Sequence, residues 1–160
     1  MGRSLTNEEI MRLIDRHSAH HYERYHVVLD SGYGRRVMDW ETRQGYLDMI
    51  AGYSAVIFGR SGKYYDRVVS AAISQLQDKK LAVVTGSYPT EPYAKFCQKI
   101  TSFCSMDKVL VMNTGAEAVE AAMKIARRWG YVKKGIPENQ AKIIFCRNNF
   151  HGRTLGVLSG

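Results

Sequence analysis

The chain has 160 residues, of which 45% are hydrophobic and 24% charged, a balance typical of a globular protein rather than a disordered one. The formal net charge is +8, but the cations are scattered in pairs, so we expect a solvated surface and no nucleic-acid partner. No apolar run reaches the roughly 20 residues of a membrane helix, and the N-terminus lacks the features of a signal or transit peptide. These observations predict a cytoplasmic protein with no membrane partner. The three cysteines form no C-x-x-C motif, and we expect no metal site.

The first 59 residues are predicted to form a small N-terminal segment. Thr6 and Glu9 have the spacing of a capping box, and apolar residues then recur at helical intervals, which predicts a helix over 6–18. Short apolar runs at 27–29, 37–40 and 46–49 follow, separated by turns that contain glycine. This pattern is typical of a small antiparallel meander.

From residue 60 to 160, helical patterns alternate with apolar, strand-like runs. The helical patterns cover 68–76, 91–104 and 119–126, and the apolar runs cover 81–84, 108–112 and 143–146. This alternation predicts an α/β fold with a mostly parallel sheet. So few strands leave an open sheet edge, so we expect either that residues 60–160 are the truncated first part of a larger domain or that the chain needs a partner to complete its core.

The segment from Val109 to Ala126 reads as a strand, a turn of small residues and a helix, an arrangement that binds phosphate groups. The first backbone N–H groups of a helix have no intrahelical acceptor, and the helix dipole favours an anion there. Gly115 allows close approach of the backbone, Ala116 adds no bulk, and Thr114 offers a hydroxyl. The segment matches neither a P-loop nor a dinucleotide fingerprint. On the pattern alone, a simple helix cap explains it equally well.

Two motifs in this part of the chain resemble those of the class III aminotransferases, which use pyridoxal 5′-phosphate. Residues 113–120 read Asn-Thr-Gly-Ala-Glu-Ala-Val-Glu and resemble the phosphate-binding motif of that family. Residues 149–154 read Asn-Phe-His-Gly-Arg-Thr and resemble a second motif of the family. Segments 52–56, 126–131 and 134–139 look like the ornithine aminotransferases in particular. The resemblance implies a fold-type I homodimer whose large domain holds the cofactor on a mostly parallel sheet.

The resemblance also implies which residues bind the cofactor. Backbone groups of the turn are expected to hold the phosphate, and Phe150 is expected to stack on the pyridine ring, shielding it from water. Without the resemblance, Phe150 reads as an ordinary core aromatic. The cofactor-binding residues predicted in this way are Thr114, Gly115, Ala116, Phe150 and His151.

Three further residues are implied in substrate binding. Arg153 is expected to bind the substrate carboxylate, a task suited to the two-pronged donor geometry of arginine. Tyr22 matches a tyrosine that helps to bind this carboxylate, and Tyr53 matches one that lines the pocket and favours ornithine. Without the resemblance, Arg153 reads as a surface arginine and neither tyrosine stands out.

The chain departs from the ornithine aminotransferase pattern at two places. The Gly-His-x-His-Pro motif of that group is replaced at residues 59–63 by Gly-Arg-Ser-Gly-Lys. Residues 85–88 read Thr-Gly-Ser-Tyr, with glycine where the family tends to have arginine.

The sequence predicts the N-terminal part of an ornithine δ-aminotransferase, which moves an amino group from ornithine to a 2-oxoacid. The chain lacks the Schiff-base lysine of the family, so we predict no catalytic residue within it and no turnover by the chain alone. Two alternatives stay open. One is another class III ω-aminotransferase, of the acetylornithine or 4-aminobutyrate type, and the other is a degenerate, non-catalytic partner of such an enzyme.

Overall fold

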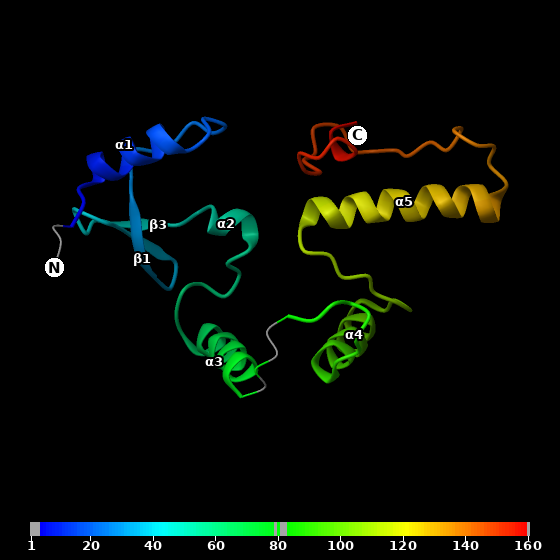
Figure 1. Ribbon diagram of the computed structural model, residues 1–160, viewed down its shortest axis with the longest axis horizontal. Helices are drawn as coiled ribbons and strands as arrows, with labels where there is room; N and C mark the ends of the chain where they lie inside the picture. The colour runs from blue at the N-terminus through cyan, green and yellow to red at the C-terminus, as the bar shows by residue number, and fades with distance from the viewer. Residues whose placement is uncertain (1–3, 79, 81–82, 160) are drawn as a thin grey trace. The chain divides into compact units, whose positions relative to one another are not determined.

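The structure, a computed structural model, describes residues 4–78, 80 and 83–159. The chain divides into two compact units, residues 1–85 and residues 86–160 (Figure 1). Within the described residues, no helix is both long enough and apolar enough to cross a membrane. The predicted division into 1–59 and 60–160 concerns the domains of the complete fold and stays a prediction.

The first unit is built around a three-stranded antiparallel sheet in the order β1-β2-β3. The strands are β1 (Leu29–Tyr33), β2 (Arg36–Asp39) and β3 (Gly45–Leu47). Tyr33 pairs with Arg36 across the first turn, and Val37 pairs with Tyr46 across the second. Short turns between neighbouring strands make these contacts local, so the predicted meander is confirmed.

Helix α1 (Asn7–His17) is joined to the end of β2 by a buried carboxylate. Thr6 and Glu9 form the predicted capping box, with both hydrogen bonds present. Asp39 is only 3% exposed and accepts hydrogen bonds from the Asn7 amide group and from the backbone N–H of Thr42. These bonds lower the pKa of Asp39 from 3.8 to about 2, the Thr42 N–H contributing most. The predicted N-terminal helix is therefore confirmed, and its first turn is fixed to the sheet.

Two helices complete the first unit. The short turn α2 (Ala51–Ser54) follows β3, and α3 (Lys63–Gln77) begins after Gly62, whose φ of 96° favours glycine. The helix predicted over 68–76 is thus longer than the apolar stripe indicated. Of the strand predicted over 81–84, residues 81–82 lie outside the described part of the chain, and Val83 and Val84 are not in a strand.

The second unit consists of helices α4 (Glu91–Cys104) and α5 (Gly115–Lys134) and a short 3-10 helix, η1 (Val157–Ser159). Pro92 lies in the first turn of α4, where its missing N–H costs nothing. Helix α5 ends at Gly135 in the left-handed conformation. In this unit the buried apolar side chains among the described residues are Ala121 and Val157, which belong to α5 and η1.

The two apolar runs of this unit are not strands in the structure. Residues 108–112 and 143–146 form no β-ladder, so these strand assignments are wrong for the chain as described. The physical reason is that a parallel strand gains its hydrogen bonds only from neighbouring strands distant in sequence. The α/β class, with an N-terminal helix and antiparallel meander, is confirmed, whereas the described residues contain no parallel sheet.

Candidate functional site

The start of α5 is held by a second capping box. The Thr114 hydroxyl accepts a hydrogen bond from the Glu117 N–H at 3.1 Å. In return, the Glu117 carboxylate accepts hydrogen bonds from the N–H groups of Asn113 at 2.8 Å and Thr114 at 3.0 Å. The Thr-x-x-Glu sequence dictates this arrangement, because each side chain satisfies N–H groups that the helix itself leaves unpaired.

The capping box leaves two N–H groups at the helix start for another acceptor. Among the described residues, no hydrogen-bond acceptor is assigned to the N–H of Gly115 or Ala116. A Cβ atom added to Gly115 would meet nothing within 4 Å, so there is open space beside these groups. The helix dipole adds a partial positive charge, while the nearby Glu117 carboxylate opposes it in part. The predicted turn therefore has two free donors and room for an anion.

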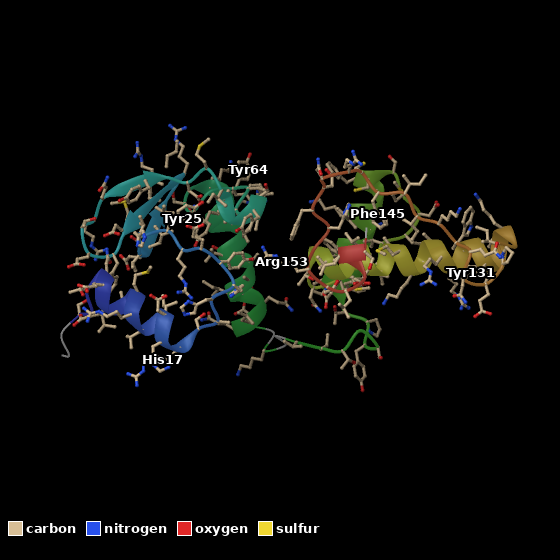
Figure 2. The ribbon with its side chains drawn as sticks, turned by 90° about the horizontal axis from the view of Figure 1, so that it is seen from above. His17, Tyr25, Tyr64, Tyr131, Phe145 and Arg153 are labelled. Carbon is tan, nitrogen blue, oxygen red and sulfur yellow. The ribbon has the colours of Figure 1, made fainter. Side chains whose placement is uncertain are left out.

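The second predicted motif packs directly against this helix start. Gly152 has a φ of 126°, and a Cβ atom there would lie 2.7 Å from the Ala116 Cβ. The Thr154 hydroxyl donates to the Glu120 carboxylate at 2.5 Å. Both Figure 1 and the view from above in Figure 2 show the red C-terminal segment lying beside the first turns of α5. Two motifs that are about thirty residues apart in sequence thus share one location.

The aromatic and cationic side chains of the second motif lie on the same loop. Phe150 is 76% exposed, and the Arg153 guanidinium carbon lies 6.0 Å from its ring centre. His151 packs against Phe145 with ring centres 4.9 Å apart, and its buried Nε2 atom has no hydrogen-bond partner. Arg153 and Phe145 are labelled in Figure 2. An open pocket is lined by Asn149, Phe150, His151, Gly152, Arg153, Val157 and Leu158.

The pocket and the helix start are adjacent but separate. Gly115 and Thr114 are not among the residues that line the described pocket, although Ala116 contacts Gly152 at its edge. The structure therefore brings the two predicted motifs together without enclosing Gly115 and Phe150 in one cavity. The roles predicted for these residues toward a cofactor stay predictions.

The two predicted substrate tyrosines belong to the first unit. Tyr22 is half exposed, with its ring 4.4 Å from that of His21. Tyr53 is 84% exposed and lies in the α2 turn. Their predicted contacts with a substrate stay predictions. Within the described ranges, no group of three or more His, Cys, Asp or Glu side chains is placed to hold a metal ion.

Sequence reasoning missed Glu120, which anchors the second motif. Glu120 accepts from Thr154, and a Cβ atom on Gly156 would lie 2.4 Å from its carboxylate. A signal was present, because Glu120 lies four residues after Ala116 and three before Met123, on the same face of the helix as these apolar residues. An acidic residue within an apolar stripe indicates a polar partner on the neighbouring element.

Comparison with known proteins places the chain in a family. Residues 17–160 match the model of the aminotransferase class-III family. The chain is 40% identical to a mitochondrial ornithine aminotransferase of Oryza sativa subsp. japonica, over 99% of the chain and 32% of that protein. It is 39% identical to the ornithine aminotransferase of Saccharomyces cerevisiae, over 98% of the chain and 35% of that protein.

Solved structures agree. The ornithine aminotransferase of Toxoplasma gondii ME49 matches with a TM-score of 0.89 and 34% identity, over 98% of the chain and 36% of that protein. The acetylornithine aminotransferase of Elizabethkingia anophelis matches with a TM-score of 0.82 and 45% identity, over 94% of the chain and 36% of that protein. The chain thus spans about a third of the length of the relatives it matches. On these findings, this chain belongs to the class III aminotransferase family.

Proposed function

We propose that the chain is the N-terminal part of a pyridoxal 5′-phosphate-dependent ornithine δ-aminotransferase. The complete enzyme transfers the δ-amino group of ornithine to a 2-oxoacid, giving glutamate semialdehyde and an amino acid. The observation that carries this proposal is the contact between Gly152 and Ala116, which joins a helix start with two free N–H groups to a loop bearing an aromatic ring and an arginine. The ornithine aminotransferases of rice and yeast support the choice of substrate.

The residues at the start of α5 fit the phosphate of the cofactor. The N–H groups of Gly115 and Ala116 would donate to the phosphate oxygens, with the Thr114 hydroxyl beside them. Phe150, which is largely exposed, would cover the pyridine ring and exclude water from it. His151 would support the same loop through its contact with Phe145. When bound, the cofactor supplies an electron sink that allows the amino group to leave its carbon.

Three side chains would bind and orient the amino donor. Arg153 carries a planar pair of donors suited to the α-carboxylate, and it lies on the same loop as Phe150. Tyr22 would add a hydroxyl to this carboxylate site. Tyr53 would line the substrate pocket of the complete enzyme and favour ornithine. These tasks are binding and orientation, which lower the barrier by fixing the reacting groups in place.

A second candidate is an aminotransferase that acts on acetylornithine. The specific observation in its favour is the 45% identity to the Elizabethkingia anophelis protein, which exceeds the 40% identity to the rice protein. An assay of the complete protein with ornithine, acetylornithine and 4-aminobutyrate decides between the candidates. Turnover with ornithine in clear excess supports the first, and preference for acetylornithine supports the second. Absence of turnover with all three supports the degenerate partner instead.

The homodimer and the cytoplasmic location also stay proposals. The matching ornithine aminotransferase of rice is a mitochondrial protein, so the family resemblance alone does not fix the location. Light scattering of the purified protein measures the oligomeric state, and cell fractionation measures the location.

A single substitution tests the phosphate site. Gly115→Pro removes one N–H at the first helical position, where proline is tolerated and where the extended backbone of Thr114 suits a following proline. Loss of one hydrogen bond to a charged group is expected to weaken cofactor binding about tenfold while α5 stays folded. Cofactor titration by absorbance measures the first effect, and circular dichroism measures the second.

Gly115→Ala is the control for this experiment, because it keeps the N–H and its methyl group meets nothing within 4 Å. Its affinity is expected to stay closer to that of the wild type. Equal cofactor affinity for the wild-type and Gly115→Pro proteins would contradict the proposed phosphate site.

A further inference from the structure

The turn that carries Tyr53 has an unusual backbone. Ala51, Gly52, Tyr53 and Ser54 have φ values of 50°, 58°, 56° and 69°, so four consecutive residues lie in the left-handed region. Only glycine enters this region without a steric penalty. Such a conformation persists when the surrounding structure holds it in place, so the contacts that hold this turn determine where Tyr53 lies.

The first of these contacts is made by Asp48, at the end of β3. One carboxylate oxygen accepts hydrogen bonds from the N–H groups of Ile50 at 3.0 Å and Ala51 at 2.9 Å. The other oxygen pairs with the Arg60 guanidinium at 2.6 Å. The Ala51 N–H and the Arg60 side chain lower the pKa of Asp48. Asp48 therefore bridges the left-handed turn and Arg60.

Arg60 is itself fixed to the β1–β2 hairpin. Its N–H donates to the Gly34 carbonyl at 2.9 Å, and the Gly34 N–H donates to the Ser61 hydroxyl at 2.8 Å. The Arg60 side chain crosses Gly32, where an added Cβ atom would lie 2.1 Å from the Arg60 Cδ. Its side chain and that of Asp48 are only 27% and 12% exposed. The ion pair therefore links a fixed hairpin to the Tyr53 turn, and is not a free surface contact.

We propose that Arg60 is a positioning residue for Tyr53. By holding Asp48 against the hairpin, Arg60 keeps the 51–54 turn left-handed and so sets the place of the Tyr53 ring in the amino-donor pocket. This inference rests on the proposed function for the substrate that Tyr53 meets, whereas the link from Arg60 to the turn rests on the contacts above. Arg60 lies within residues 59–63, where the chain departs from the ornithine aminotransferase pattern, so the proposal assigns a structural role to this segment.

Hydrogen exchange in the complete protein tests the structural link without any assay of activity. Arg60→Met removes the guanidinium and is expected to speed exchange about tenfold at Ile50, Ala51 and Val56, whose N–H groups bond within the turn. Arg43→Met is the matched control, since the described contacts of the Arg43 guanidinium are with Asp30 of β1 and the Trp40 ring and not with the 51–54 turn. Equal exchange in the Arg60→Met and Arg43→Met proteins would overturn the proposal.

Two other variants test the same ion pair, one by displacing the Arg60 side chain and one by keeping its charge. Gly32→Ala places a methyl group on the path of the Arg60 side chain and is expected to reproduce the faster exchange of Arg60→Met. Arg60→Lys keeps the positive charge and is expected to restore much of the protection. If Arg60→Met does not fold, the exchange pattern of Gly32→Ala decides in its place.

Steady-state kinetics of the same proteins test the consequence for substrate choice. In Arg60→Met and Gly32→Ala, KM for ornithine is expected to rise about tenfold while kcat changes little, and the preference for ornithine over acetylornithine falls with it. Arg43→Met is expected to keep the wild-type preference. Wild-type protein without ornithine turnover contradicts the proposed function, and the exchange data still decide the role of Arg60. If the wild-type protein turns over ornithine and Arg60→Met keeps the same preference for ornithine over acetylornithine, the positioning role of Arg60 is contradicted.

Discussion

The two units of the chain reach their structures by different routes. In residues 1–85, three neighbouring strands pair through short turns, and a buried carboxylate fixes the preceding helix to them. In residues 86–160, two helices and a short 3-10 helix carry the order, while the apolar runs at 108–112 and 143–146 form no ladder. Antiparallel strands joined by short turns therefore pair within a short chain, whereas a parallel sheet depends on distant segments.

A tryptophan in each unit allows the two to be followed separately. The chain contains two tryptophans, Trp40 in the first unit and Trp129 in α5. The Trp40 indole donates to the Leu5 carbonyl at 2.7 Å, next to the contact between α1 and the sheet. Replacing either tryptophan by phenylalanine leaves the other as the reporter of its own unit.

The largest loss of stability is expected from Asp39→Ala, and it is expected to affect the first unit only. Four donors lose their acceptor. They are the Asn7 side-chain amide, the Glu41 N–H, the Thr42 N–H and the Thr42 hydroxyl. Since the pKa of Asp39 is lowered on folding, its contribution to stability is present above pH 3.8 and is lost as the pH falls toward about 2. Trp40 fluorescence during acid titration of the Trp129→Phe chain measures this transition.

Asp39→Ala is expected to remove the part of the acid transition that lies in this pH window. The Trp129 reporter of the second unit is expected to respond equally with and without Asp39. A shift of the Trp129 signal by Asp39→Ala would show that the two units do not behave independently.

A smaller loss of stability is expected from Gly152→Ala, which acts on the second unit. The added methyl group would meet the Ala116 Cβ at 2.7 Å on a backbone whose φ of 126° disfavours a side chain. We expect a loss of about 2 kcal/mol in the free energy of unfolding, together with displacement of the Phe150 loop from α5. Urea denaturation followed by Trp129 fluorescence in the Trp40→Phe chain measures the loss.

The control for this substitution is Gly86→Ala, an exposed position where an added Cβ atom meets nothing within 4 Å. Its denaturation midpoint is expected to match that of the unchanged chain. Equal midpoints for Gly152→Ala and Gly86→Ala would contradict the contact between the second motif and the helix start.

The smallest effect is expected from removing the threonine of either capping box. Helices α1 and α5 begin with the same Thr-x-x-Glu capping box. Thr6→Ala and Thr114→Ala are each expected to cost about 1 kcal/mol, because each removes one cap hydrogen bond. In the complete protein, only Thr114→Ala is expected to weaken cofactor binding, since Thr114 lies beside the free N–H groups of Gly115 and Ala116. An equal loss of affinity in both variants would contradict the assignment of α5 as the phosphate site.

The elements that could be predicted from sequence are those whose signals are local. Capping-box spacing predicted the start of α1, apolar patterns predicted α4 and the middle of α5, and glycine turns separated the strands of the meander, because each signal depends on residues close together in the chain. The two motifs that carry the family resemblance were also visible in sequence. Their expected roles came from the resemblance, because on the pattern alone a simple helix cap explains the first motif equally well.

Contacts between distant residues became visible only in the folded chain. The sequence does not show which residues form the contact of Gly152 with Ala116, the bond of Thr154 with Glu120 and the ion pair of Asp48 with Arg60, because the partners are distant in the chain or on separate elements. The same reason explains the failed strands, since an apolar run becomes a strand only when a neighbour supplies the hydrogen bonds. Local chemistry therefore fixed the helices and the hairpins, and long-range packing fixed the site.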